Sequence, residues 1–175
     1  MKRLSILIVL ALSVPCMAQT AQPPAPGPEV QKLGYFLGTW KSEGESKASP
    51  FGPAGKFSGI ETCEWFAGGF QLVCRAEGTM PGGKRTSLAI LTYDGAAKAY
   101  TSYSISSQGE SMSVKGSLAG KTWTWLWDGQ VEGKAVKFRG TMVEVSPNAY
   151  TFKGEIATGG GPFAVTEEGK ATKVK

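Results

Sequence analysis

The residues that could carry chemistry in this sequence are few, because none of its 175 residues is a histidine. Without histidine there is no Ser-His or Cys-His dyad, no histidine metal site and no side chain whose ordinary pKa lies near neutrality. Carboxylates are the remaining acid-base candidates, and a carboxylate-based enzyme therefore stays open as an alternative. We predict no catalytic residue and lean toward a protein that is not an enzyme.

Two carboxylate positions could place an acid inside the protein. Glu61 shares a predicted strand face with Cys63 and Trp65, so it is either a buried acid in a pocket or an exposed residue of a hairpin. Glu167 and Glu168 are adjacent, and successive strand residues point to opposite faces. At most one of this pair can therefore enter an interior.

Cys63 and Cys74 flank a six-residue segment, 65–70, that contains the turn signal Gly68-Gly69. A turn at these glycines places the two cysteines opposite each other on the same side of a hairpin, which predicts a disulfide and an oxidising compartment. A redox pair or a metal site is the alternative, but the spacing is not C-x-x-C and no imidazole is present. Segment 81–87 has only the composition of a phosphate loop, since it joins two predicted strands. We expect no metal and no cofactor.

Aromatic residues give the other signal of function. Trp123, Trp125 and Trp127 alternate with smaller residues, so three indoles share one face of a strand. They could be core, a stacking wall for a flat apolar ligand, or an exposed stripe covered by a partner. The predicted ligand-pocket residues are Trp65, Tyr93, Tyr103, Trp123, Trp125, Trp127, Phe138, Phe152 and Glu61.

The N-terminus has the pattern of a secretory signal peptide. Residues 1–18 combine two basic residues, an apolar run and a small-residue cleavage site after Ala18. The run is shorter than the ~20 residues needed to span a bilayer, so we predict an exported protein, periplasmic or extracellular, with no transmembrane segment. A lipid anchor at Cys16 is the alternative, which Pro15 and Ser13 do not favour because they fit a lipobox poorly.

The remaining chain is predicted to be a Pro-rich flexible tether, residues 19–28, followed by a single β-barrel domain, residues 29–175. Removal of Lys2 and Arg3 with the signal peptide lowers the formal net charge from +5 by two, to +3. This small, scattered charge does not favour a nucleic-acid partner.

From Gly38 onward the hydrophobic pattern has a period of two and is interrupted by glycine-rich turns, which favours an all-β fold. We predict an antiparallel up-and-down β-barrel of about ten strands, because short connections pair neighbours in sequence. A short helix that begins at Pro28 is expected to plug one end, with Val30, Leu33 and Phe36 or Leu37 on one face. The predicted strands are 39–47, 55–66, 70–79, 84–93, 98–106, 110–118, 121–127, 133–145, 149–157 and 162–174.

The segment Leu37-Gly38-Thr39-Trp40, placed after a short helix, resembles the G-x-W signature of lipocalin and calycin barrels. Together with segments 63–69, 91–94 and 98–100, it is similar to the exported bacterial domain-of-unknown-function family 1579. The resemblance implies a calycin-like barrel and no agreed activity. It is also similar in size and strand count to the haem-binding nitrobindin barrels, but it lacks the histidine that ligates iron there, and we expect no haem.

The chain differs from lipocalins in having no arginine on the last strand to stack on the tryptophan, where only Lys170, Lys173 and Lys175 occur. Gly38 and Trp40 are therefore interpreted as a structural pin between helix and barrel. The sequence predicts an exported, non-enzymatic barrel that binds a small hydrophobic or amphipathic ligand. A Trp-rich module that docks on a protein or the envelope is the second hypothesis, and a carboxylate-based enzyme using Glu61 or Glu168 is the third.

Overall fold

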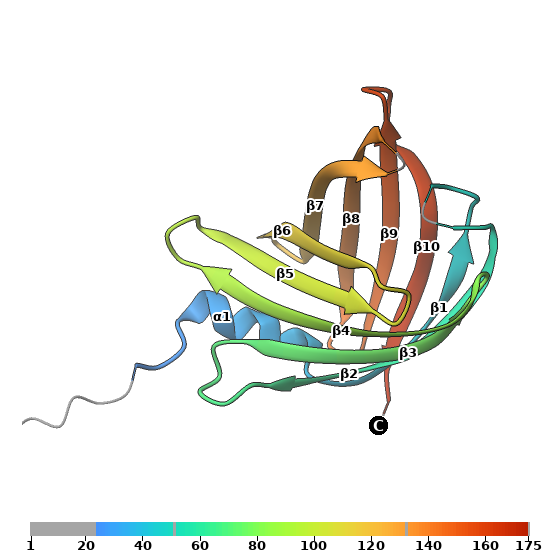
Figure 1. Cartoon of the computed structure of the whole chain (residues 1–175). Helices are drawn as coiled ribbons and strands as arrows, with labels where there is room; N and C mark the ends of the chain where they lie inside the picture. The colour runs from blue at the N-terminus through green and yellow to red at the C-terminus, as the bar shows by residue number, and fades with distance from the viewer. Residues whose placement is uncertain (1–23, 51, 132, 175) are drawn as a thin grey trace, which may run out of the picture.

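Ten strands form a closed antiparallel barrel in which each strand pairs with its neighbours in sequence and β10 pairs with β1 (Figure 1). The computed structural model describes residues 24–50, 52–131 and 133–174. The predicted signal peptide and the first part of the tether lie outside the described residues. The predicted all-β barrel is confirmed. Its strands are β1 (Gly38–Ser46), β2 (Gly55–Trp65), β3 (Leu72–Met80), β4 (Gly83–Asp94), β5 (Ala99–Ser106), β6 (Ser111–Ala119), β7 (Thr122–Val131), β8 (Lys134–Ser146), β9 (Ala149–Thr158) and β10 (Ala164–Lys173).

The strand boundaries follow the alternating sequence pattern, with one informative exception. Strand β7 continues to Val131, through Asp128 and Gly129, which the sequence predicts to be a turn. Asp128 and Gly129 pair with Lys137 and Val136 of β8, and a Cβ atom at Gly129 would overlap the indole of Trp127. Gly129 therefore leaves room for an aromatic ring inside a strand and does not act as a turn residue.

A short helical segment closes one end of the barrel, which we call the plug end. Helix α1 (Pro28–Lys32) begins at a proline and continues into a 3₁₀ turn, η1 (Leu33–Phe36). Val30, Leu33 and Phe36 are buried, as their shared face predicts. The opposite end, where β1 ends and β2 begins, is called the distal end.

Hydrogen bonds from barrel side chains fix this segment in place. The indole Nε1 of Trp40 donates to the backbone carbonyl of Phe36 at 2.8 Å. The Tyr100 hydroxyl donates to Glu29, with its oxygen 2.9 Å from a carboxylate oxygen. The Tyr35 hydroxyl lies 2.9 Å from two carbonyl oxygens at the β8–β9 turn, and burial raises the pKa of Tyr35 to about 12. The plug is therefore tied to β1, β5 and the β8–β9 turn.

The hydrophobic core is an aromatic cluster gathered around the plug. Trp40 and Trp123 are 1% and 0% exposed, and both contact rings from the plug or from other strands. Ring centroids lie 5.2 Å apart for Phe36 and Trp123, and 5.0 Å apart for Trp40 and Tyr150. Packing of this kind contributes beyond the area that it buries. Most of the barrel's apolar packing is thus concentrated at the plug end.

Lys173, on the last strand, lies over the ring of Trp40. Its Nζ lies 5.2 Å from the centroid of the Trp40 ring, and the two residues are direct partners between β10 and β1. A lysine ammonium over an indole face makes a cation–π contact. Gly38, at the start of β1, has a φ of +92° and lies under the Lys173 stem. A glycine is favoured there because it tolerates a positive φ and because it has no Cβ to crowd the lysine.

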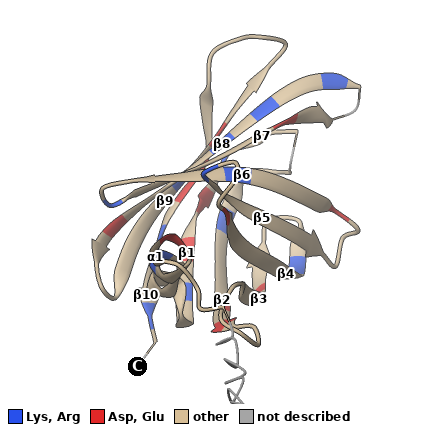
Figure 2. Ribbon diagram, turned by 90° about the vertical axis from the view of Figure 1, so that its left-hand side faces the viewer, with Lys and Arg blue, Asp and Glu red and all other residues tan. Residues whose placement is uncertain are grey.

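Charged residues of both signs are dispersed along the strands in the view of Figure 2, without gathering into one patch. None of the helices in the described part of the chain has the length and apolarity needed to cross a membrane.

Candidate functional site

The inward-facing residues of the distal half differ in size between two sides of the barrel. Direct partners across strands share a face. Trp40, which is buried, pairs with Glu61, Glu61 pairs with Ala76, and Ala76 pairs with Ser87, so all four face inward. Strands β2–β5 carry small inward residues along this half. We call these the small-residue wall: Gly59, Ala76, Gly78, Ser87, Ala89, Ser102 and Ser104.

Large rings face inward from the opposite side, on β7–β9. We call them the aromatic wall: Trp125, Trp127, Phe138 and Phe152. Trp125 stacks on Trp123 with ring centroids 6.2 Å apart and planes at 6°. Small residues on one wall and flat rings on the other are the arrangement that a planar apolar ligand requires.

Solvent reaches the inward face in the distal half but not near the plug. Along β5, Tyr100 is buried whereas Ser102, Ser104 and Ser106 are half-buried. Along β7, exposure likewise rises from Trp123, at 0%, to the half-buried Trp127. The inward side chains of the distal interior, which we call the lumen, are therefore partly accessible to solvent.

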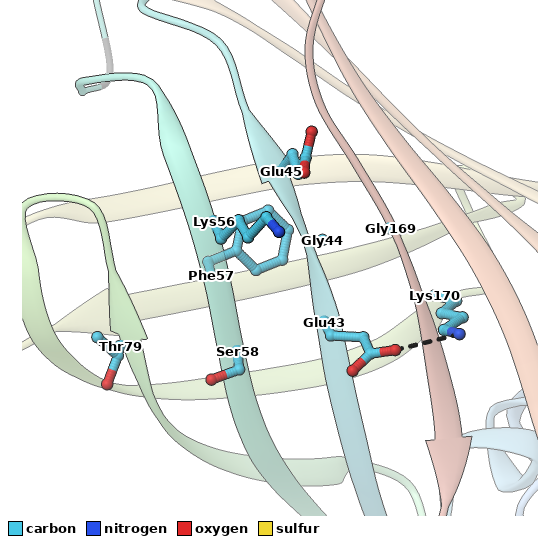
Figure 3. A pocket seen from close by; sticks show the side chains of 9 residues that line it. All are labelled: Glu43, Gly44, Glu45, Lys56, Phe57, Ser58, Thr79, Gly169 and Lys170. Atoms are coloured by element: carbon cyan, nitrogen blue, oxygen red, sulfur yellow. Dashed lines mark ion pairs between the residues drawn. The ribbon is translucent and has the colours of Figure 1, made fainter.

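An open recess of about 750 Å³ lies on the barrel wall at β1, β2 and β10 (Figure 3). Gly44 and Gly169 pair directly across these strands, and rings from the two flanking strands, Phe57 and Phe152, cover them from inside with centroids 5.9 Å apart. Exposed charges rim the recess, among them Lys170, whose Nζ lies 3.1 Å from a carboxylate oxygen of Glu43. The full lining is Glu43, Gly44, Glu45, Lys56, Phe57, Ser58, Thr79, Gly169 and Lys170.

Glu61 faces the interior from β2, between Trp40 of β1 and Ala76 of β3, at the boundary between the plug-end core and the lumen. No residue in 24–50, 52–131 or 133–174 forms a hydrogen bond or an ion pair with its carboxylate. Although part of Glu61 stays accessible, burial raises the pKa of this carboxyl. Its charge also contributes, after burial, to the raised pKa of Tyr150 on β9, a residue of the plug-end core.

The predicted disulfide between Cys63 and Cys74 is confirmed, and it lies beside Glu61. A Glu61 oxygen and both sulfur atoms lie within 4.8 Å of one another. Because the sulfur atoms are bonded to each other, they cannot act as thiolate ligands, and this group does not form a metal site.

Three other charged residues that face inward, Glu144, Lys173 and Arg85, have compensating neighbours. Glu144 accepts a hydrogen bond from the Trp123 indole at 2.7 Å, and Lys173 covers Trp40. Arg85 pairs with Glu110 at 2.6 Å near the distal end. Burial raises the pKa of Glu167, and the nearby charge of Arg85 partly offsets that effect. Glu168, which the enzyme hypothesis considered, is exposed on the outside.

The predicted pocket residues divide into several groups. Trp65 and Tyr93 pack against the plug-end core, and Trp123 belongs to it completely. Tyr103 lies on the outer face at 50% exposure, so it does not line the interior. The remaining rings form the aromatic wall, of which Trp125, at 7% exposure, also belongs to the core cluster. An exposed tryptophan stripe, the basis of the docking hypothesis, is contradicted because Trp123 and Trp125 are buried.

Sequence reasoning did not single out the small-residue wall, Phe57 or Arg85 as parts of the interior, and it left open which of Glu167 and Glu168 faces inward. Phe57 has the same strand phase as Glu61 and Cys63, so alternation along β2 could have placed it. Glycine and serine give no hydrophobic signal, and only the register of neighbouring strands identifies them as inward.

The family model described as protein of unknown function, DUF1579, matches residues 25–173, which is most of the chain. The chain belongs to this family. Among solved structures, Rv2717c from M. tuberculosis is similar at a TM-score of 0.59 and 13% identity, with 86% of this chain and 99% of that chain covered. The S-type phycobiliprotein lyase CPES from Guillardia theta is similar at a TM-score of 0.53 and 12% identity, with 83% and 92% covered. No curated protein matches the sequence. At these identities the DUF1579 chain shares with the solved structures a fold and not a known activity.

Proposed function

We propose that this DUF1579 protein is an exported, non-enzymatic barrel that binds a small hydrophobic or amphipathic molecule in its lumen. The observation that carries the proposal is the solvent-accessible distal interior between the small-residue wall and the aromatic wall. A barrel that needed only stability would fill this half with large apolar side chains, as it does at the plug end. The lumen offers a ligand ring faces on one side and serine hydroxyls on the other.

Export is supported by the signal-like pattern of residues 1–18 and by the disulfide, which persists in oxidising compartments. We propose cleavage after Ala18, with residues 19–28 as a tether ahead of the barrel. The mass of the protein isolated from a periplasmic or culture fraction tests this directly. A chain that retains residues 1–18, or carries a lipid on Cys16, would contradict it.

A role in ligand binding accounts for an inward-facing Glu61 better than a role in carboxylate-based catalysis does. An acid of raised pKa can donate a proton, but a carboxylate mechanism also needs a second carboxylate or a nucleophile placed with it. Within the described ranges, no such group contacts Glu61. We therefore favour a role in ligand recognition.

The test of lumen binding uses a neutral fluorescent apolar probe and a matched pair of variants. Ser104→Leu adds a branched side chain to the small-residue wall, whereas Ser113→Leu adds the same group on the exposed face of the neighbouring strand. We expect the inward change to reduce probe uptake about tenfold and the outward change to leave it unaltered. Lack of uptake by the unmodified protein, together with no bound mass in native mass spectrometry of protein from its own host, would refute lumen binding.

A further inference from the structure

We propose that the ligand is an organic cation, an amine or similar cationic nitrogen on a flat apolar body, whose nitrogen binds the Glu61 carboxylate. This inference rests on the proposed function, because it names the ligand class for the same lumen. The charged side chains that face inward are not all paired. Neither Glu61 nor Glu167 has a hydrogen-bond or ion-pair partner among the described residues, whereas Glu144, Lys173 and Arg85 each have one. Glu167 lies within range of the Arg85 charge, and no described residue places such a positive charge near Glu61.

An acid without a partner in a partly desolvated position is unfavourable for the empty barrel. The position of Glu61 is fixed, because it lies between the pinned Trp40 and the disulfide-linked Cys63 and Cys74. The carboxylate therefore cannot turn outward with its strand. A cation that enters the lumen would supply the missing partner and form a charge-assisted hydrogen bond.

The surroundings of Glu61 favour the same charge on the ligand. Trp40, the direct strand partner of Glu61, packs against Tyr150 with ring centroids 5.0 Å apart. The Tyr150 ring lies 6.3 Å from that of Phe152, which in turn lies 5.9 Å from that of Phe57. Aromatic faces attract cations, as Lys173 already demonstrates on Trp40. A second acid, Glu167, faces inward at the distal end. An anionic amphiphile, such as a fatty acid, would meet two like charges there, and we expect the lumen to reject it.

The test compares three probes with the same ring system: naphthylmethylamine, which is cationic, naphthylmethanol, which is neutral, and naphthoate, which is anionic. Binding to the mature protein is measured by isothermal titration calorimetry at neutral pH. We expect the amine to bind about tenfold more tightly than the alcohol, and naphthoate to bind more weakly than either.

The variant Glu61→Gln keeps the shape of the side chain and removes its charge. We expect it to weaken amine binding about tenfold while alcohol binding stays within about twofold. Glu77→Gln, on the exposed face of β3, is the matched control and should change neither affinity. Circular dichroism melting establishes that both variants are folded.

The outcomes separate this inference from the proposed function. If none of the three probes binds, lumen binding itself is refuted. If the alcohol binds and the amine binds no more tightly, the lumen is a binding site but the cation preference is wrong. If the amine is preferred but Glu61→Gln has no effect, while Glu167→Gln removes the preference, the site is assigned to the wrong acid and the inference is overturned.

Discussion

Replacing Trp40 with phenylalanine tests whether the G-x-W tryptophan pins the helical plug to the barrel. The indole is 1% exposed, and its Nε1 donates to the Phe36 carbonyl at 2.8 Å. The same ring carries the ammonium of Lys173 at 5.2 Å. Phenylalanine keeps an aromatic ring at the site but has no N–H group and fills less space.

Three losses add up in this variant. The Phe36 carbonyl loses its side-chain donor, which costs about 1–3 kcal/mol in a buried setting. The smaller ring leaves a void that costs roughly 1 kcal/mol, by comparison with other reductions of core side chains. The cation–π contact weakens by part of its ~0.5–1 kcal/mol. We therefore expect a loss of about 3 kcal/mol in the free energy of unfolding, a large share of the roughly 5–15 kcal/mol typical of a domain.

Urea unfolding followed by tryptophan fluorescence measures the loss, and Trp65→Phe is the control. Trp65 packs against the same core but makes no hydrogen bond with a described residue, so it should lose only about 1 kcal/mol for the reduction in volume. For a chain of this size the Trp40 variant should also melt about 10 °C lower. Equal losses in the two variants would show that the hydrogen bond to Phe36 contributes nothing, and the pin interpretation would be wrong.

Three further outcomes are expected. Lys173→Met keeps the stem over Trp40 and removes the charge, so it should lower the free energy of unfolding by about 0.5–1 kcal/mol in urea melts, an effect that high salt should not abolish. Gly129→Ala places a methyl group against the Trp127 indole and should destabilise the barrel by about 1–3 kcal/mol, visible as a lower melting temperature. Glu61→Gln should raise the free energy of unfolding at pH 7, by about 1.4 kcal/mol for each unit by which burial raises the pKa of Glu61. Because the folded state binds this proton more tightly than the unfolded state does, the advantage should fade as pH falls from the raised pKa toward 4.5, and urea melts across that range would detect it.

The strands and the disulfide could be predicted because they depend on local pattern. Alternation and glycine turns place the strand boundaries, and the Gly68-Gly69 turn sets the register that brings Cys63 opposite Cys74. The direction in which each strand faces is a different kind of information. Tyr100 and Tyr103 are three positions apart and must face opposite sides of β5, and nothing in the strand says which one is inside. The plug decides, because the Tyr100 hydroxyl donates to Glu29.

The identity of the inward acid on β10 depends on an irregularity that alternation cannot predict. Ala164 pairs with Ile156 on the inner face, and regular alternation from Ala164 would also turn Glu168 inward. A register shift between Val165 and Glu167 inserts one extra residue, so Glu167 faces inward. A one-residue bulge therefore exchanges the two adjacent acids between lumen and solvent.

The plug end is packed with large buried side chains, whereas the distal half is lined by small and polar ones, and this contrast favours function at the distal end. The plug end contains the disulfide, the Trp40 pin and the fully buried Trp123. The distal half has glycines paired with glycines and accessible serines, and the acid without a described partner, Glu61, lies beside the Trp40 pin where the plug-end core ends. Sites that violate the rules of packing are where binding is expected to have priority over stability. One change can separate the two requirements, because Glu61→Gln should make the protein more stable and the binding of an amine weaker. A purely structural acid would not give both effects.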